Sequence, residues 1–165
     1  AGDFTIDQLD QGQHVNAIKA GTFDGGYTLE PSATIIAKTG AGYTVEAGVI
    51  SKYILGDVNA NAYAAGCAFT TEFIKGRPDV AKRFAAGWAK AIEFIRSNPA
   101  DARKHLAKNT LTPEDLVDVV PPLGYTMTRD MTPKQREELQ KFADFGVQIG
   151  VVPEKIDVSK YLVSL

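Results

Sequence analysis

The chain opens with FTIDQL (residues 4–9), in which apolar and polar side chains alternate. That two-residue period is typical of a β-strand with one buried face. Residues 13–20 then place apolar side chains at mostly helical spacing, and Gly21 follows where a helix commonly ends. A second candidate strand, FDGGYTL (residues 23–29), is ended by Pro31. Strand, helix and strand in this order predict an α/β fold built on a parallel β-α-β unit with a right-handed crossover.

Beyond this unit the pattern changes from short strands to helices. We expect a short helix near residues 31–38, a brief strand at 43–45 and a fully buried strand at 63–69, where Cys67 would be a small core residue. After Pro78 the apolar residues recur at helical spacing, with further helix starts at the following positions: Asn98-Pro99, Thr112-Pro113 and Thr132-Pro133.

Composition sets the broad class. The chain has 165 residues, of which 44% are hydrophobic and 23% charged, the balance of a soluble globular protein. A formal net charge of −2 excludes strong general attraction to nucleic acid or anionic membranes. The basic surplus between Lys75 and Lys108 is interpreted as the solvated face of amphipathic helices. The first residues are neither basic nor apolar, so we expect a chain that is cytosolic, processed or a fragment.

The sequence offers few residues for catalysis. The two histidines, His14 and His105, are far apart and lack the spacing of a metal site. The glycine-rich residues 39–44 match neither a phosphate loop nor a dinucleotide-binding loop, and no hydrolase elbow is present. We therefore expect no enzyme activity, no metal and no cofactor.

Glu30 is the strongest candidate for a binding residue. It follows an uncharged candidate strand and precedes Pro31, which favours an extended conformation. It would then lie at the carboxyl end of a parallel strand, where α/β sheets bind ligands. Tyr27 and Thr28 could add an aromatic wall and a hydroxyl group to the same pocket. The alternative is an exposed acid placed near the positive end of a helix.

Two stretches resemble a known family. AIKAGTFDGGYTLEP (residues 17–31) resembles the A-x-x-x-G-x-(V/I/F)-D-(A/G)…(D/E)-P segment of solute-binding proteins of ABC importers, of the nitrate/sulfonate/taurine type. FIKGRPDV (residues 73–80), followed by a long helix and SNPADA (residues 97–102), resembles a second signature of that family. The region 145–157 is similar to the family's C-terminal end.

The resemblance implies the C-terminal half of a two-lobed protein with a type II periplasmic-binding fold. By this matching, residues 1–50 are the C-terminal part of the second lobe, 51–62 cross between the lobes, and 63–165 return to the first lobe. The implied function is extracytoplasmic: the protein, in the periplasm or at the outer face of the membrane, binds a small anion and presents it to an ABC importer permease. Glu30 matches the acidic position of the cleft, and Tyr27 and Thr28 match the same cleft segment.

Two other functions stay open at this point. One is an enzyme related to those that make the thiamine pyrimidine precursor, although such relatives look richer in cysteine and histidine. The other is the ligand-sensing domain of a regulator, which would carry a helix-turn-helix. In addition, a half-protein leaves apolar surfaces without partners, so we expect self-association.

Overall fold

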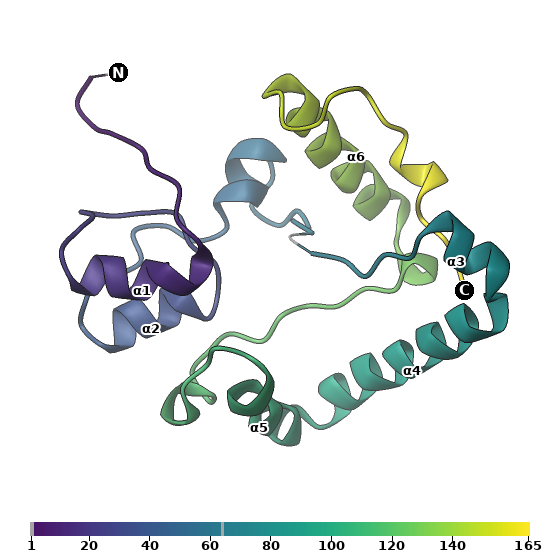
Figure 1. Cartoon of the computed structure of the whole chain (residues 1–165), viewed down its shortest axis with the longest axis horizontal. Coiled ribbons are helices and arrows are strands. Elements are labelled where there is room, and N and C mark those ends of the chain that lie inside the picture. Colours follow the sequence, from purple (N-terminus) through teal and green to yellow (C-terminus); the bar gives the residue numbers. More distant parts are fainter. Residues whose placement is uncertain (1, 64) are drawn as a thin grey trace. The chain divides into compact units, whose positions relative to one another are not determined.

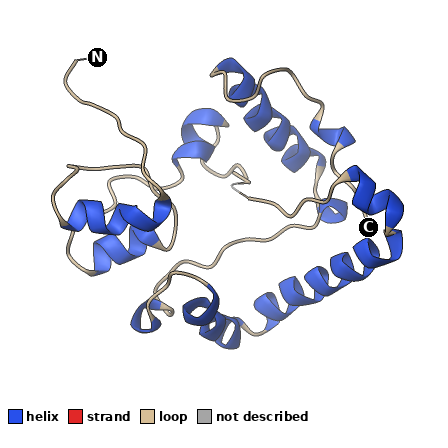
Figure 2. Cartoon of the chain, viewed as in Figure 1, coloured by secondary structure: helices blue, strands red, loops and turns tan. Residues whose placement is uncertain are grey.

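The computed structural model is helical and describes residues 2–63 and 65–165 (Figure 1). Within that part of the chain, helices and loops are present and no β-strand is formed (Figure 2). The predicted α/β fold of the type II periplasmic-binding kind, with its parallel β-α-β units, is therefore wrong. The predicted helices at residues 13–20 and 31–38, in contrast, are confirmed as α1 (Gln11–Lys19) and α2 (Ser32–Lys38).

The predicted strands fail because no sheet partner covers them. Phe4 and Ile6, which would face the core, are 72% and 82% exposed. Val45 in the third candidate strand is 87% exposed. An isolated strand has no hydrogen bonds to a neighbouring strand and no buried face. Alternation of apolar and polar residues alone therefore does not stabilise an extended strand. The fourth candidate, 63–69, includes residue 64, which lies outside the described residues; residues 65–69 form no strand, and Cys67 is exposed rather than buried.

The chain divides into two units, and each is described by itself. The first comprises Ala1–Val45 and Phe94–Leu123. In it α1 packs on α2, and α5 (Pro99–Asn109) is followed by a 3₁₀ turn, η2 (Glu114–Leu116). The helix expected at Thr112-Pro113 is limited to that turn. The guanidinium of Arg103 on α5 holds the segment by donating to the carbonyls of Val117 and Val120, at 2.7 and 2.8 Å.

The second unit comprises Glu46–Glu93 and Gly124–Leu165. Its elements are the π-helical turn η1 (Ile50–Ile54), α3 (Thr71–Gly76), most of α4 (Pro78–Ser97), η3 (Thr128–Asp130), α6 (Pro133–Gln148) and η4 (Val158–Lys160). Both η1 and η4 pack on α6. The predicted lobes and crossing segment follow a different division, and they stay predictions.

Helix α6 begins and is held by local signals that the sequence predicted. The Oγ1 of Thr132 accepts the backbone N–H of Gln135 at 3.2 Å, and the Oε1 of Gln135 accepts the backbone N–H of Thr132 at 2.9 Å. This reciprocal capping box satisfies two donors that the first turn leaves unpaired. Farther along α6, Gln140 donates to the carbonyl of Ile156 and accepts from Val158 N–H, which ties the C-terminal segment to the helix.

Helix α4 is amphipathic, as the apolar spacing predicted, but its large apolar residues Phe84 and Trp88 are 45% and 41% exposed. Ala81, Ala85 and Ile92 are buried on one side, while Lys82 and Arg83 are exposed. No helix in the described part of the chain has the length and apolar character that crossing a bilayer requires.

Candidate functional site

The three sequence-predicted site residues lie on one loop of the first unit. Residues 23–30 connect α1 to α2, and they carry Tyr27, Thr28 and Glu30 (Figure 1). The Tyr27 side chain is 59% exposed, whereas Thr28 and Glu30 are half-buried. The three residues are neighbours because they are close in sequence. They do not lie at the edge of a sheet, which is where the sequence analysis predicted them.

Thr28 is positioned by a histidine on α1. The Nδ1 of His14 lies 2.8 Å from Thr28 Oγ1, and its Nε2 lies 3.0 Å from the carbonyl oxygen of Leu9. A carbonyl only accepts, so Nε2 carries the proton; in the neutral ring Nδ1 then accepts the hydroxyl proton of Thr28. Both ring nitrogens have partners, so the two contacts fix the orientation of the imidazole. Sequence reasoning assigned His14 no role and missed its contact with Thr28, because the contact joins residues 14 positions apart.

Glu30 has one structural bond and one spare oxygen. Its Oε2 accepts the backbone N–H of Thr34 in the first turn of α2 at 3.2 Å. Its backbone carbonyl accepts a long bond from the Nε2 of Gln11, at 3.4 Å. Within the described residues, Oε1 has no hydrogen-bond partner. The two interpretations of Glu30 are therefore compatible: one oxygen satisfies a helix donor, and the other is available to a donor from outside.

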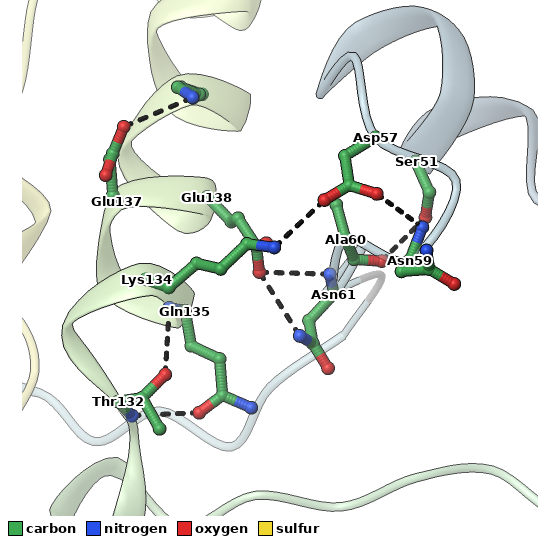
Figure 3. Close-up of polar contacts among 11 residues, drawn as sticks. Ser51, Asp57, Asn59, Ala60, Asn61, Thr132, Lys134, Gln135, Glu137 and Glu138 are labelled. Atoms are coloured by element: carbon green, nitrogen blue, oxygen red, sulfur yellow. Dashed lines mark hydrogen bonds and ion pairs between the residues drawn. The ribbon is translucent and has the colours of Figure 1, made fainter.

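The second unit contains a polar hollow that sequence reasoning did not find. It has a volume of about 220 Å³ and lies between α6 and the loop that follows η1. Its lining combines three acids and two lysines with two apolar side chains: Leu55, Asp57, Ala60, Lys134, Glu137, Glu138 and Lys141. Figure 3 shows the polar contacts around it.

Glu138 is the buried acid of this hollow. Only 4% of the residue is exposed, and its Oε2 accepts both the backbone N–H of Asn61 at 3.0 Å and the Asn61 side-chain amide at 3.2 Å (Figure 3). Its Oε1 has an accessible area below 1 Å² and no hydrogen-bond partner. The nearest cation, the Nζ of Lys134, is 3.7 Å away, beyond hydrogen-bond distance.

Lys134 is directed to a different acid. Its Nζ donates to the Oδ2 of Asp57 at 2.9 Å. This hydrogen bond lowers the pKa of Asp57, with a further contribution from the backbone N–H of Asn59, and it raises the pKa of Lys134. The two side chains are 39% and 66% exposed, so water screens the pair. Lys134 and Glu138 are four residues apart on α6, a spacing typical of a surface ion pair; nothing local in the sequence indicates that Glu138 is buried.

Metal ligands do not gather in the described part of the chain: no group of three or more His, Cys, Asp or Glu side chains there could hold an ion. Comparison with known proteins adds no family. No family model, no curated protein and no solved structure matches the chain. The resemblance to importer solute-binding proteins therefore rests on the sequence motifs alone and stays a prediction.

Proposed function

We propose that the chain is a non-catalytic solute-binding component of an ABC-type importer, acting in the periplasm or at the outer face of the membrane. Its solute is a small anion of the nitrate, sulfonate or taurine kind, which the protein hands to the permease. The support is the order of the family-like segments at residues 17–31, 73–80 and 97–102.

The observation that carries the proposal is the spare oxygen of Glu30. Glu30 Oε1 is not among the buried oxygens that lack a partner in the described part of the chain, so it is open to solvent and is an acceptor that a ligand donor can reach. The exposed phenol of Tyr27, three residues earlier, can both donate and accept. Because a carboxylate repels a bare anion, the solute that fits best also carries an N–H or O–H group that donates to Glu30.

Thr28 fits the same role through its fixed hydroxyl. With its proton directed to His14 Nδ1, the Thr28 oxygen keeps lone pairs that accept from a solute donor.

The test is a thermal-shift screen with nitrate, sulfonates, aminosulfonates, bicarbonate, aromatic carboxylates and pyrimidines. A ligand present at about a hundred times its Kd stabilises the folded state by about 2.7 kcal/mol. Calorimetry on Glu30→Gln should then show a loss of affinity of about tenfold, since the amide donates where the carboxylate accepted. Asp24→Asn, an exposed acid on the same loop, is the matched control and should leave the affinity unchanged. If no compound shifts the unfolding temperature, or if Glu30→Gln binds a confirmed solute as the native chain does, the proposal is wrong.

A further inference from the structure

The hollow beside α6 contains a carboxylate oxygen whose bonding is incomplete. Glu138 is buried, and its Oε2 is saturated by two donors from Asn61. Its Oε1 has none. Leaving a buried acceptor of this kind without a donor is unfavourable, and more so when the group is charged. A donor that enters the hollow recovers this free energy.

We propose that this hollow is a binding site for the ammonium group of a short aliphatic primary amine, which donates to Glu138 Oε1. The site lies in the second unit, and it is independent of the solute site proposed at Glu30 in the first unit.

The charge of the lining favours a cation. Three carboxylates, those of Asp57, Glu137 and Glu138, face the ammonium groups of Lys134 and Lys141. Each lysine is already paired, Lys134 with Asp57 at 2.9 Å and Lys141 with Glu137 at 3.2 Å. Glu138 Oε1 is left with a 3.7 Å ion pair to Lys134 and no hydrogen-bond donor, and the three carboxylates outnumber the two lysines. The complementary ligand is therefore a monocation with N–H donors.

Size and apolar surface limit the rest of the ligand. The hollow has a volume of about 220 Å³. Its lining includes two apolar residues that are otherwise buried, Leu55 and Ala60. This space admits a chain of a few methylene groups beside the charged atoms. Each methylene group that leaves water on binding adds to the affinity.

Lys134 controls access to the site. Its ammonium lies 3.7 Å from Oε1, and its side chain is 66% exposed although it donates to Asp57. The accessible area of Oε1 is below 1 Å², so a ligand needs a side-chain movement to reach it, and we expect Lys134 to be the side chain that moves. Lys134 and the ligand ammonium thus compete for the same carboxylate.

Because of this competition, removing Glu138 should weaken amine binding and removing Lys134 should strengthen it. Calorimetry of the native chain with n-propylammonium chloride should show saturable binding. Tetramethylammonium has the same charge and no N–H donor, so it should bind at least about tenfold more weakly. Glu138→Gln keeps an oxygen for Asn61 and places an amide at the Oε1 position, and it should lose binding by about tenfold or more. Lys134→Met should bind propylammonium more tightly than the native chain.

Glu137→Gln is the matched control, because it removes one carboxylate of the same lining but leaves Glu138 in place. Its affinity should change less than that of Glu138→Gln. Equal affinity for the two cations, equal losses in the two glutamine variants, or absence of binding to the native chain at tens of millimolar would each overturn the site. Should Glu138→Gln fail to fold, the comparison of the two cations and the sign of the Lys134→Met effect decide.

Discussion

Glu138 and Asn61 are joined by two hydrogen bonds across 77 residues of sequence, from the backbone N–H and the side-chain amide of Asn61 to one carboxylate oxygen. The ion pair between Lys134 and Asp57 bridges the same two segments (Figure 3). Nearby, the Oγ of Ser51 donates to the carbonyl of Ala60 at 2.9 Å, inside the loop that follows η1. The loop is thus held to α6 by polar contacts, and these contacts also shape the hollow.

Asn61→Ala should therefore destabilise the second unit. The variant keeps the backbone donor and loses the 3.2 Å amide bond to a charged acceptor, worth about 1.5–3 kcal/mol. Urea unfolding followed by circular dichroism measures the change. The control is Asn59→Ala, because alanine retains the 2.9 Å bond from the backbone N–H to Asp57 and loses only the smaller side-chain contribution of Asn59. Equal stability of the two variants would mean that the amide bond to Glu138 contributes nothing.

The helices were predictable because their signals are local. The Thr132-Pro133 helix start and the helical spacing of the apolar residues after Pro78 are contained within a few turns of sequence. A strand, in contrast, needs a neighbour that its own residues do not specify. The alternation in residues 4–9 predicted a buried face, and Ile6 at 82% exposure has nothing to pack against.

The candidate sites divide in the same way. Glu30 was identified from its place before Pro31, a local feature, and its bond to Thr34 follows from the start of α2. Glu138 was missed because its burial depends on a loop that reaches it from Asn61. In the sequence Glu138 is one of several acidic residues on α6, and it stands four residues after Lys134, the spacing of a solvent-exposed ion pair. Only the fold distinguishes it from Glu137, whose side chain is 67% exposed.

Gly146→Ala should destabilise the end of α6. A methyl group at this position would lie 2.9 Å from the Cγ2 of Val152, a stiff β-branched side chain. Overpacking of this kind costs about 1–3 kcal/mol, which outweighs the gain of up to about 1 kcal/mol from replacing a helical glycine. Thermal unfolding measures the net loss.

Val152→Ala provides the companion variant for this clash. In the double variant the methyl group introduced at position 146 would occupy space that the valine side chain vacates, so the two losses should not add. A coupling free energy of about 0.5–3 kcal/mol is expected from the double-mutant cycle. Strict additivity would mean that Gly146 is not in contact with Val152.

The Asp57–Lys134 pair should make stability depend on pH at both extremes. The pKa of Asp57 is lowered from 3.8, so its contribution is present above pH 3.8 and is lost as the pH falls through the lower folded value. The pKa of Lys134 is raised from 10.5, so its contribution is complete below pH 10.5 and is lost above it. Asp57→Asn should lower the free energy of unfolding between these limits, slightly because the pair is exposed. The difference from the native chain should shrink as the pH falls below 3.8; a difference that stays constant there would contradict the assignment.

The exposed apolar surface predicts that the chain associates with itself. The accessible surface is 12,070 Å². A compact monomer of 17.8 kDa exposes about 8,000 Å², and two separate compact domains of half that mass expose about 9,600 Å² in total. The excess therefore does not depend on how the two units are placed. Among the described residues no large side chain is fully buried, and Phe84 and Trp88, stacked at 5.9 Å on α4, are 45% and 41% exposed.

Sedimentation velocity at micromolar concentration should show dimers or larger species. An obligate interface between copies buries more than about 2,000 Å², and the excess accessible surface of this chain is large enough to supply one. Replacing Phe84 and Trp88 together by serine should shift the distribution toward the monomer, since stacked aromatic side chains dominate interface energetics. Tyr43→Ser serves as the control, because Tyr43 is a single aromatic residue that is 83% exposed. The unpaired strand edges that the sequence predicted are absent from the described part of the chain, so the apolar side chains alone must drive association. A native chain that sediments as one sharp monomer would show that they do not.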